Sequence, residues 1–115
     1  MTVRVESTPP VVTAHLAGEI DHHEARRVRE QVDQAVERIR ARELRLDFSG
    51  VTFMDSAGVG LLMGRFKLMQ SLGGRLVVTD VPPRLEKMMK LAGLDRLPIW
   101  EVQPDKGEVT DETRQ

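Results

Sequence analysis

Strand-like and helix-like segments alternate along this chain, and that alternation limits the folds open to it. Alternating apolar and polar residues, or a short apolar run, are typical of strands, and they occur at residues 3–6, 11–18, 44–48 and 75–79. Two longer segments, 21–39 and 56–72, instead repeat apolar side chains at helical spacing. Strands that alternate with helices predict an α/β fold whose sheet is parallel in part and carries packed helices.

Turn and capping residues place the boundaries of these elements. Pro9-Pro10 separates the first two strands and predicts a hairpin. Asp21, with Glu24 three residues later, has the pattern of a capping box and is expected to begin the first helix. Ser49-Gly50 is expected to end the third strand, and Gly73-Gly74 the second helix.

A third helix and a last short strand are predicted near the C-terminus. Pro82-Pro83 opens the helix, and residues 98–100 have the composition of a strand. The expected order is therefore ββαβαβαβ, with about five strands in a mixed sheet and helices mainly on one face. Residues 1–102 are expected to form one domain. Residues 103–115 contain one valine as their only aliphatic residue, so we expect a mobile polar tail.

Size and composition exclude several classes of function. The 115 residues suit one domain with its own core, and the absence of cysteine excludes thiol chemistry and cysteine-based metal sites. A net charge of −1, with three Phe and one Trp, argues against a nucleic-acid surface. No apolar run is long enough for a membrane span, and the first residues do not resemble a signal peptide. We therefore expect a cytoplasmic domain, and the near-neutral charge favours a monomer.

The stretch FMDSAGVG, residues 53–60, contains the residue most suggestive of function. Ser56 lies where a strand is expected to end and a helix to begin, which is where sites gather in parallel sheets. Three roles are open to it. It could act as a nucleophile, it could cap the helix together with Asp55, or it could receive a phosphate.

A nucleophilic serine is the least supported of these roles. The G-x-S-x-G turn of a nucleophile elbow lacks its first glycine, because Met54 occupies that position. The serine would also need a base, and His15, His22 and His23 all precede it. Adjacent histidines on a helix point about 100° apart and chelate a metal poorly. We therefore expect no enzyme activity, no metal and no cofactor.

Helix capping explains Asp55-Ser56 but not the glycines that follow. Gly58, Gly60 and Gly64 each cost about 1 kcal/mol relative to alanine in a helix, which indicates close approach by a neighbouring strand or a partner protein. A phosphate on Ser56 would be favoured by the amide groups and the dipole of the helix N-terminus. It would add about −1.5 to −2 charge beside Asp55 and change the affinity of any partner that docks there.

Three stretches of the chain resemble the STAS domain of anti-sigma factor antagonists. They are GEIDHHEA (18–25), LDFSGVTFMDSAGVGLLMGRFK (46–67) and GGRLVVTDVPPRLEKMMKLAGLDRL (73–97), and the similarity extends to about Val102. GEIDHH is most similar to the subgroup that controls the forespore sigma factor of sporulating bacteria. The final helix that often packs on the domain in this family is not expected, because residues 103–115 lack its apolar periodicity.

The resemblance implies a protein that regulates transcription by partner switching. In this family the unphosphorylated antagonist binds an anti-sigma factor that is also a serine kinase, and the sigma factor is freed. The kinase then phosphorylates the serine after the Asp of the motif, here Ser56, and the antagonist is released until a serine phosphatase restores it. Many members have Ser or Thr at the next position, where this chain has Ala57, so the acceptor is unambiguous.

The resemblance also implies which residues meet the kinase. Glu19, Asp21 and Asp47 are expected near Ser56, at the ends of neighbouring strands. The full expected partner-binding set is Glu19, Asp21, Asp47, Asp55, Ser56, Ala57, Gly58, Val59, Gly60 and Met88. Structural explanations stay open for two of them, since Asp21 also caps a helix and Met88 also suits a core position.

Two other functions stay open for a chain with this pattern. One is a general stress-response antagonist that uses the same partner switch with a different kinase. The other is a STAS subunit of a transporter or signalling assembly, which needs no phosphorylation. The sequence does not name the sigma factor.

Overall fold

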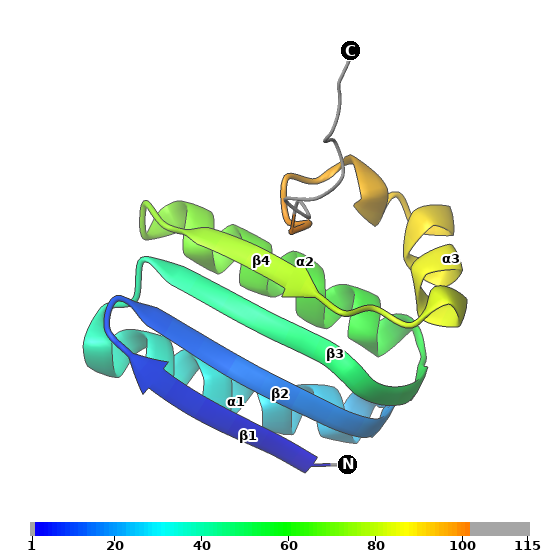
Figure 1. Cartoon of the computed structure of the whole chain (residues 1–115), viewed down its shortest axis with the longest axis horizontal. Coiled ribbons are helices and arrows are strands. Elements are labelled where there is room, and N and C mark those ends of the chain that lie inside the picture. Colours follow the sequence, from blue (N-terminus) through cyan, green and yellow to red (C-terminus); the bar gives the residue numbers. More distant parts are fainter. Residues whose placement is uncertain (1, 102–115) are drawn as a thin grey trace.

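A four-stranded sheet with helices on one side forms the framework of the computed structural model, which describes residues 2–101 (Figure 1). The elements, in chain order, are β1 (Thr2–Thr8), β2 (Val11–Ile20), α1 (His22–Ile39), β3 (Glu43–Met54), α2 (Ser56–Ser71), β4 (Arg75–Thr79), α3 (Pro83–Leu91) and the short 3₁₀ helix η1 (Leu94–Arg96). The predicted α/β class and the order of the elements are confirmed as far as η1.

The sheet is mixed, as predicted, and its strands follow the order β1-β2-β3-β4. The hairpin at Pro9-Pro10 makes β1 antiparallel to β2, whereas β2, β3 and β4 are parallel to one another. Parallel neighbours need crossover connections, and these are almost always right-handed. Both crossovers advance in the same direction across the sheet, so α1 and α2 lie behind the same face (Figure 1).

The hydrophobic core lies between the sheet and these two helices. Alternate residues of β2 and β3 point into it, and the helices supply apolar side chains at helical spacing. Core residues that are almost fully buried include Val12, Ala14, Leu16, Leu44, Leu46, Phe48, Val28, Val32, Val36, Leu62 and Met69. Each buried Leu, Val or Phe contributes about 1.5–3 kcal/mol relative to its exposed state, so this layer orients the strand ends that build the site.

The opposite face of the sheet is polar, and none of the helices described in residues 2–101 covers it (Figure 1). Arg45 donates to Glu43 at 2.8 Å and to Glu101 at 2.7 Å, and Arg75 donates to Glu43 at 2.7 Å. The charged side chains that point away from the core therefore form hydrogen bonds with one another, both along β3 and between β3 and β4.

One predicted boundary was wrong, and the predicted last strand is reduced to a single bridge. Ser49-Gly50 does not end the third strand, because β3 continues to Met54. A Cβ on Gly50 would lie 2.8 Å from the Cβ of Ala17 on β2, so this glycine permits close approach of two strands. The predicted fifth strand at residues 98–100 is an isolated bridge between Val78 and Trp100, and the sheet has four strands. Pro98 lacks an amide hydrogen, which limits pairing there.

The predicted mobile tail, residues 103–115, lies outside the described residues, and the domain boundary at residue 102 stays a prediction. Within residues 2–101, none of the helices has the length and apolar character needed to cross a membrane.

Candidate functional site

Two strand-to-helix junctions lie side by side at the carboxyl ends of β2 and β3. Ile20 pairs with Met54 at the ends of the two strands, and the backbone N–H of Asp55 donates to the carbonyl of Ile20 at 3.2 Å. An aspartate begins the helix at each junction. The parallel register of the sheet therefore brings Asp21 and Asp55 to the same edge, although they are far apart in sequence.

Both aspartates cap their helices, as the sequence predicted for Asp21. Its Oδ1 accepts from the backbone N–H of Glu24 at 3.0 Å, and that hydrogen bond holds the pKa of the Asp21 carboxyl below its ordinary value. Asp55 Oδ1 accepts from the backbone N–H of Ala57 at 2.8 Å. Such caps stabilise a helix by about 1 kcal/mol, and they fix where each helix begins.

Ser56 is the first residue of α2, and its side chain is exposed. Because Asp55 supplies the cap, the Ser56 hydroxyl is not needed for it, and it forms no hydrogen bond within the described part of the chain. The amide groups of the first helical turn favour an anion at this position. The geometry suits a hydroxyl that a second protein can reach and that can carry a phosphate without refolding of the domain.

The three glycines of α2 have different roles. A Cβ on Gly58 would overlap the Cγ and Sδ atoms of Met54, which is buried at the end of β3. Gly58 is therefore required for packing of the helix on its own strand. Gly60 and Gly64 have no heavy atom within 4 Å of the position that a Cβ would take. Packing inside the domain therefore explains Gly58 but not Gly60 or Gly64.

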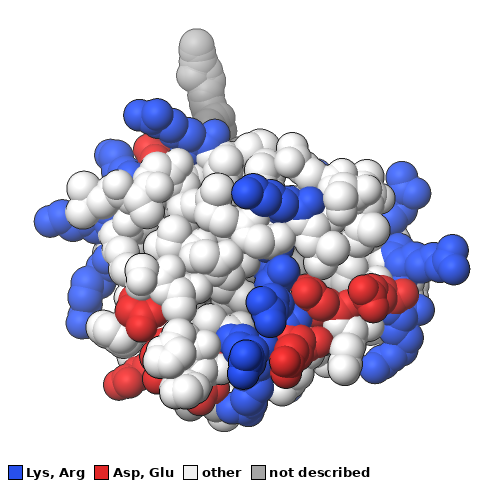
Figure 2. All heavy atoms as spheres, turned by 180° about the vertical axis from the view of Figure 1, so that it is seen from behind, with Lys and Arg blue, Asp and Glu red and all other residues white. Residues whose placement is uncertain are grey.

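The surface that begins at Ser56 is apolar for a helix so close to solvent. Residues 56–64 contain no charged side chain, and Val59 and Met63 are only partly buried. Figure 2 shows this helix-covered side, where a broad uncharged area extends across the middle of the molecule. Uncharged surface of this kind is typical of protein interfaces.

Two of the exposed large apolar side chains, Phe53 and Leu91, were missed by the sequence analysis. Phe53, opposite Glu19 in the register of β2 and β3, is 50% exposed, and Leu91 on α3 is 82% exposed. Strand alternation assigns Phe53 to one face of the sheet, but it does not reveal that half of the side chain is left exposed by residues 2–101. Met88 is partly buried on α3, which follows β4 at the same end of the sheet (Figure 1).

Asp47 does not lie with the other predicted site residues. It is seven residues before Met54, where β3 ends, or about 23 Å along the strand. The STAS resemblance implied a position near Ser56 at a strand end, but β3 continues past Ser49-Gly50 to Met54. Instead, its carboxylate contacts His15 Nδ1 at 2.8 Å on the polar face of the sheet, and Glu6 contacts His15 Nε2 at 3.2 Å.

This Glu6–His15–Asp47 cluster perturbs the protonation of its members. The hydrogen bonds to Asp47 and then to Glu6 raise the pKa of His15. Partial burial pushes the pKa of Asp47 upward, but hydrogen bonds from the Ser49 backbone N–H and from His15 outweigh it and hold that pKa below its ordinary value. Ser56 takes no part in the cluster, so these residues do not form a serine–histidine catalytic pair in this structure.

The other two histidines lie next to each other at the start of α1. His22 and His23 lie exposed in the first turn of α1 with ring centroids 4.1 Å apart. Among residues 2–101, no group of three or more His, Asp or Glu side chains is arranged to hold a metal ion.

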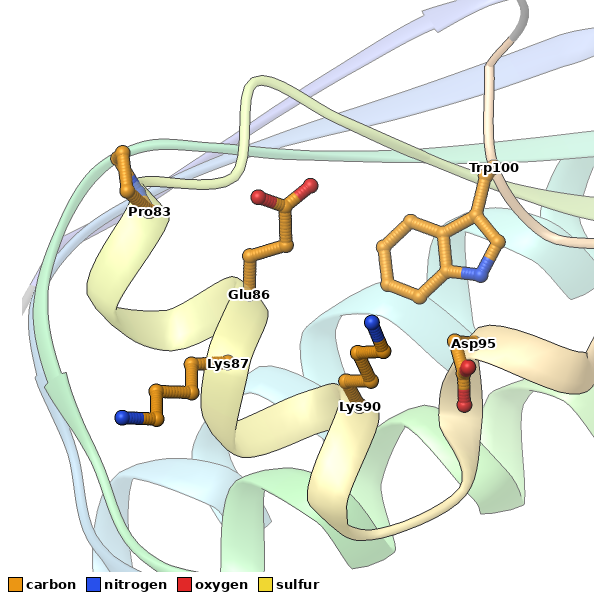
Figure 3. Close-up of a pocket in the computed structure, with 6 residues that line it drawn as sticks. All are labelled: Pro83, Glu86, Lys87, Lys90, Asp95 and Trp100. Carbon is orange, nitrogen blue, oxygen red and sulfur yellow. The ribbon is translucent and has the colours of Figure 1, made fainter.

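A hollow of about 600 Å³ lies away from Ser56, between α3 and the segment that contains Trp100 (Figure 3). Its side chains are Pro83, Glu86, Lys87, Lys90, Asp95 and Trp100. The Trp100 indole donates to the carbonyl of Leu94 at 3.1 Å, so it holds η1 in place. None of the predicted site residues lines this hollow, and its carboxylates and ammonium groups have mixed charge.

Known proteins resemble this chain over most of its length. The sequence profile of the STAS domain matches residues 2–109. An "Anti-sigma F factor antagonist" from Paenibacillus polymyxa is 34% identical over 102 residues, which cover 88% of this chain and 87% of the relative. An "Anti-sigma-B factor antagonist" from Bacillus subtilis (strain 168) is 31% identical over 94 residues, 82% of this chain and 84% of the relative.

Two solved structures of the anti-sigma factor antagonist SpoIIAA share the fold. The unphosphorylated form has a TM-score of 0.76 and 27% identity, with 90% of this chain and 91% of that chain covered. The phosphorylated form, described as a Bacillus cell fate determinant, has a TM-score of 0.70 and 27% identity over 90% and 95% of the two chains. The family profile covers nearly the whole sequence and the fold agrees, so the chain belongs to the STAS domain family.

Proposed function

We propose that this protein is an anti-sigma factor antagonist that works by partner switching. Its unphosphorylated form binds an anti-sigma factor that is also a serine kinase, and binding frees the sigma factor. Phosphorylation of Ser56 then releases the antagonist, and a serine phosphatase restores it. The protein acts as a cytoplasmic monomer, is a substrate of the kinase, and is itself no enzyme.

The observation that carries this proposal is the exposed Ser56 hydroxyl at the start of an uncharged helix surface. A kinase can transfer the γ-phosphoryl group of ATP to Ser56 Oγ, with ADP as the leaving group and the hydroxyl proton passing to a base of the kinase. Ala57 and Val59 follow Ser56 on α2, and Asp21 lies at the same edge of the sheet; together with Glu19 they would contact the kinase. Phosphorylation therefore changes the binding surface directly.

Electrostatics and packing explain why the phosphate would release the partner. The phosphate adds about −1.5 to −2 charge next to Asp55. Two unit charges 4 Å apart repel by about 1 kcal/mol in water and about 4 kcal/mol at an effective dielectric of 20. Since each 1.4 kcal/mol is about tenfold in affinity, exclusion of water at the interface would weaken binding by about tenfold to a thousandfold without any refolding.

The sporulation branch is the preferred context. The relative from Paenibacillus polymyxa is named for the anti-sigma F factor and aligns over more of the chain than the anti-sigma-B antagonist from Bacillus subtilis. The GEIDHH motif supports the same choice. A general stress-response antagonist is the second candidate, because the two relatives are similar in identity. A STAS subunit of a transporter or signalling assembly is the third.

The test is intact mass and binding with the anti-sigma serine kinase encoded in the same genome. With ATP, we expect the wild type to gain about 80 Da and leave the complex, and Ser56→Ala to stay bound at its original mass. Binding without a mass gain would contradict the phosphorylation switch. Failure to bind either a sporulation or a stress-response kinase would favour the transporter or assembly function.

A further inference from the structure

A groove of about 330 Å³ lies between α1 and α2, on the helix-covered side of the molecule (Figure 2). Ala57 and Gly60 of α2 line one wall, so the groove continues from the surface next to Ser56. Arg26 and Arg29 of α1 line the other wall, and Gly64 lies further along α2. The STAS resemblance assigned no role to Arg26 or Arg29 of α1.

The glycines of this groove have no structural explanation inside the domain. Each weakens α2 relative to alanine, yet a Cβ on Gly60 or Gly64 would meet no heavy atom within 4 Å. They are four residues apart and therefore lie on one face of the helix. Two glycines on that face leave the α2 backbone open to close approach by another chain.

Arg65 adds a buried guanidinium group to the lining of the groove. It lines the groove, and the residue is only 7% exposed. Its Nε lies 3.0 Å from Asp33 Oδ1, but the two atoms are not aligned for a hydrogen bond, and each lacks a hydrogen-bond partner among residues 2–101. Arg65 and Asp33 therefore compensate each other's charge, and the uncompensated positive charge of the groove comes from Arg26 and Arg29.

The charges at the mouth of the groove are also positive. Arg26 and Arg29 are exposed and form no ion pair within the described residues, in contrast to Arg27, which pairs with Glu24. Asp33 is the carboxylate that faces Arg65 and lies near Arg29. The lining contains three guanidinium groups and no carboxylate, and with Asp33 and Glu37 next to it the net charge is still positive.

We propose that the groove between α1 and α2 binds an acidic segment of the anti-sigma kinase. The segment's backbone lies over Gly60 and Gly64, and an Asp or Glu side chain pairs with Arg29 and Arg26. This inference rests on the proposed function. It extends the kinase contact from the start of α2 along the helix to Gly64, about two helical turns further on, and across to α1.

The test measures the affinity of the unphosphorylated full chain for the same kinase in the presence of ADP. We expect Arg29→Gln to weaken binding about tenfold and to reduce its dependence on salt, because a charged contact is lost. Gly64→Ala should also weaken binding about tenfold, although its melting temperature rises by about 4 °C through better helix propensity. Arg38→Gln, on the same helix but outside the groove, is the matched control and should bind within about twofold of wild type.

The outcomes separate the two proposals. If wild type binds and Ser56→Glu does not, but Arg29→Gln and Gly64→Ala bind normally, the groove inference is overturned and the proposed function stands. If wild type fails to bind the kinase, both are overturned. Inorganic phosphate at millimolar concentration tests a small-anion site. If phosphate shifts the amide resonances of Gly60 and Gly64 while Arg29→Gln and Gly64→Ala leave the affinity for the kinase unchanged, the groove binds a small anion and docking of a protein segment is overturned.

Discussion

Replacement of Gly58 by alanine tests whether the start of α2 depends on contact with the end of β3. A Cβ at this position would overlap Met54 Cγ and Sδ, and Met54 is buried. Overpacking of a core site costs about 1–3 kcal/mol, whereas removal of a helical glycine returns at most about 1 kcal/mol. The net loss in the free energy of unfolding is therefore about 0–2 kcal/mol.

Gly60→Ala is the matched control for this experiment. No heavy atom lies within 4 Å of its new methyl group, so the propensity gain of about 1 kcal/mol is unopposed. The free energies of unfolding of Gly58→Ala and Gly60→Ala should therefore differ by about 1–3 kcal/mol, with Gly60→Ala the more stable variant. For a domain of 115 residues, each kcal/mol corresponds to about 4 °C in melting temperature.

Urea denaturation of both variants measures these differences, and a third variant isolates the contact. Met54→Ala should cost about 2–5 kcal/mol in the wild type, but less when Gly58 is already alanine, because the overlap is then relieved. A coupling of about 1–3 kcal/mol is expected from the cycle. The reasoning is refuted if Gly58→Ala is as stable as Gly60→Ala, or if the two substitutions at Met54 and Gly58 are additive.

Three further predictions follow from the described contacts. Arg65→Met should lower the free energy of unfolding by about 1–3 kcal/mol in urea denaturation, because the half-buried carboxylate of Asp33 loses its cation. The double variant Asp33→Leu/Arg65→Met should recover most of this loss. If the losses of the two single variants simply add, the ion pair is contradicted. Because the pKa of His15 is raised, its contribution to stability is present below about pH 6.5 and is lost as the pH rises through its folded pKa. Because the pKa of Asp47 is lowered, the contribution of its carboxylate is lost as the pH falls through its folded pKa. His15→Asn should therefore cost up to about 1 kcal/mol at pH 5.5 and less at pH 9, and equal losses at both values would refute the pairing. Phe53→Ser should leave the melting temperature within about 2 °C, because the ring is 50% exposed, but should weaken kinase binding about tenfold in a titration; unchanged affinity would remove Phe53 from the interface.

Local patterns were sufficient to predict most of the fold. Alternation and helical spacing assign the first four strands and the three helices, because a side chain's period follows directly from backbone geometry. The cap at Asp21 was predicted because its hydrogen bond joins residues three apart. Ser56 at the start of α2 is a local feature of the same kind.

Contacts between distant segments explain what the sequence analysis missed. Gly50 looked like a strand end, but it lies against Ala17 and the strand continues, so Asp47 belongs to the middle of the sheet beside His15. The sequence pattern also does not distinguish the role of Gly58 from that of Gly60, because the two roles differ only through the place where the Met54 side chain packs. Strand register and the approach of α1 to α2 are set by pairing and packing across the chain, and a local pattern does not contain that information.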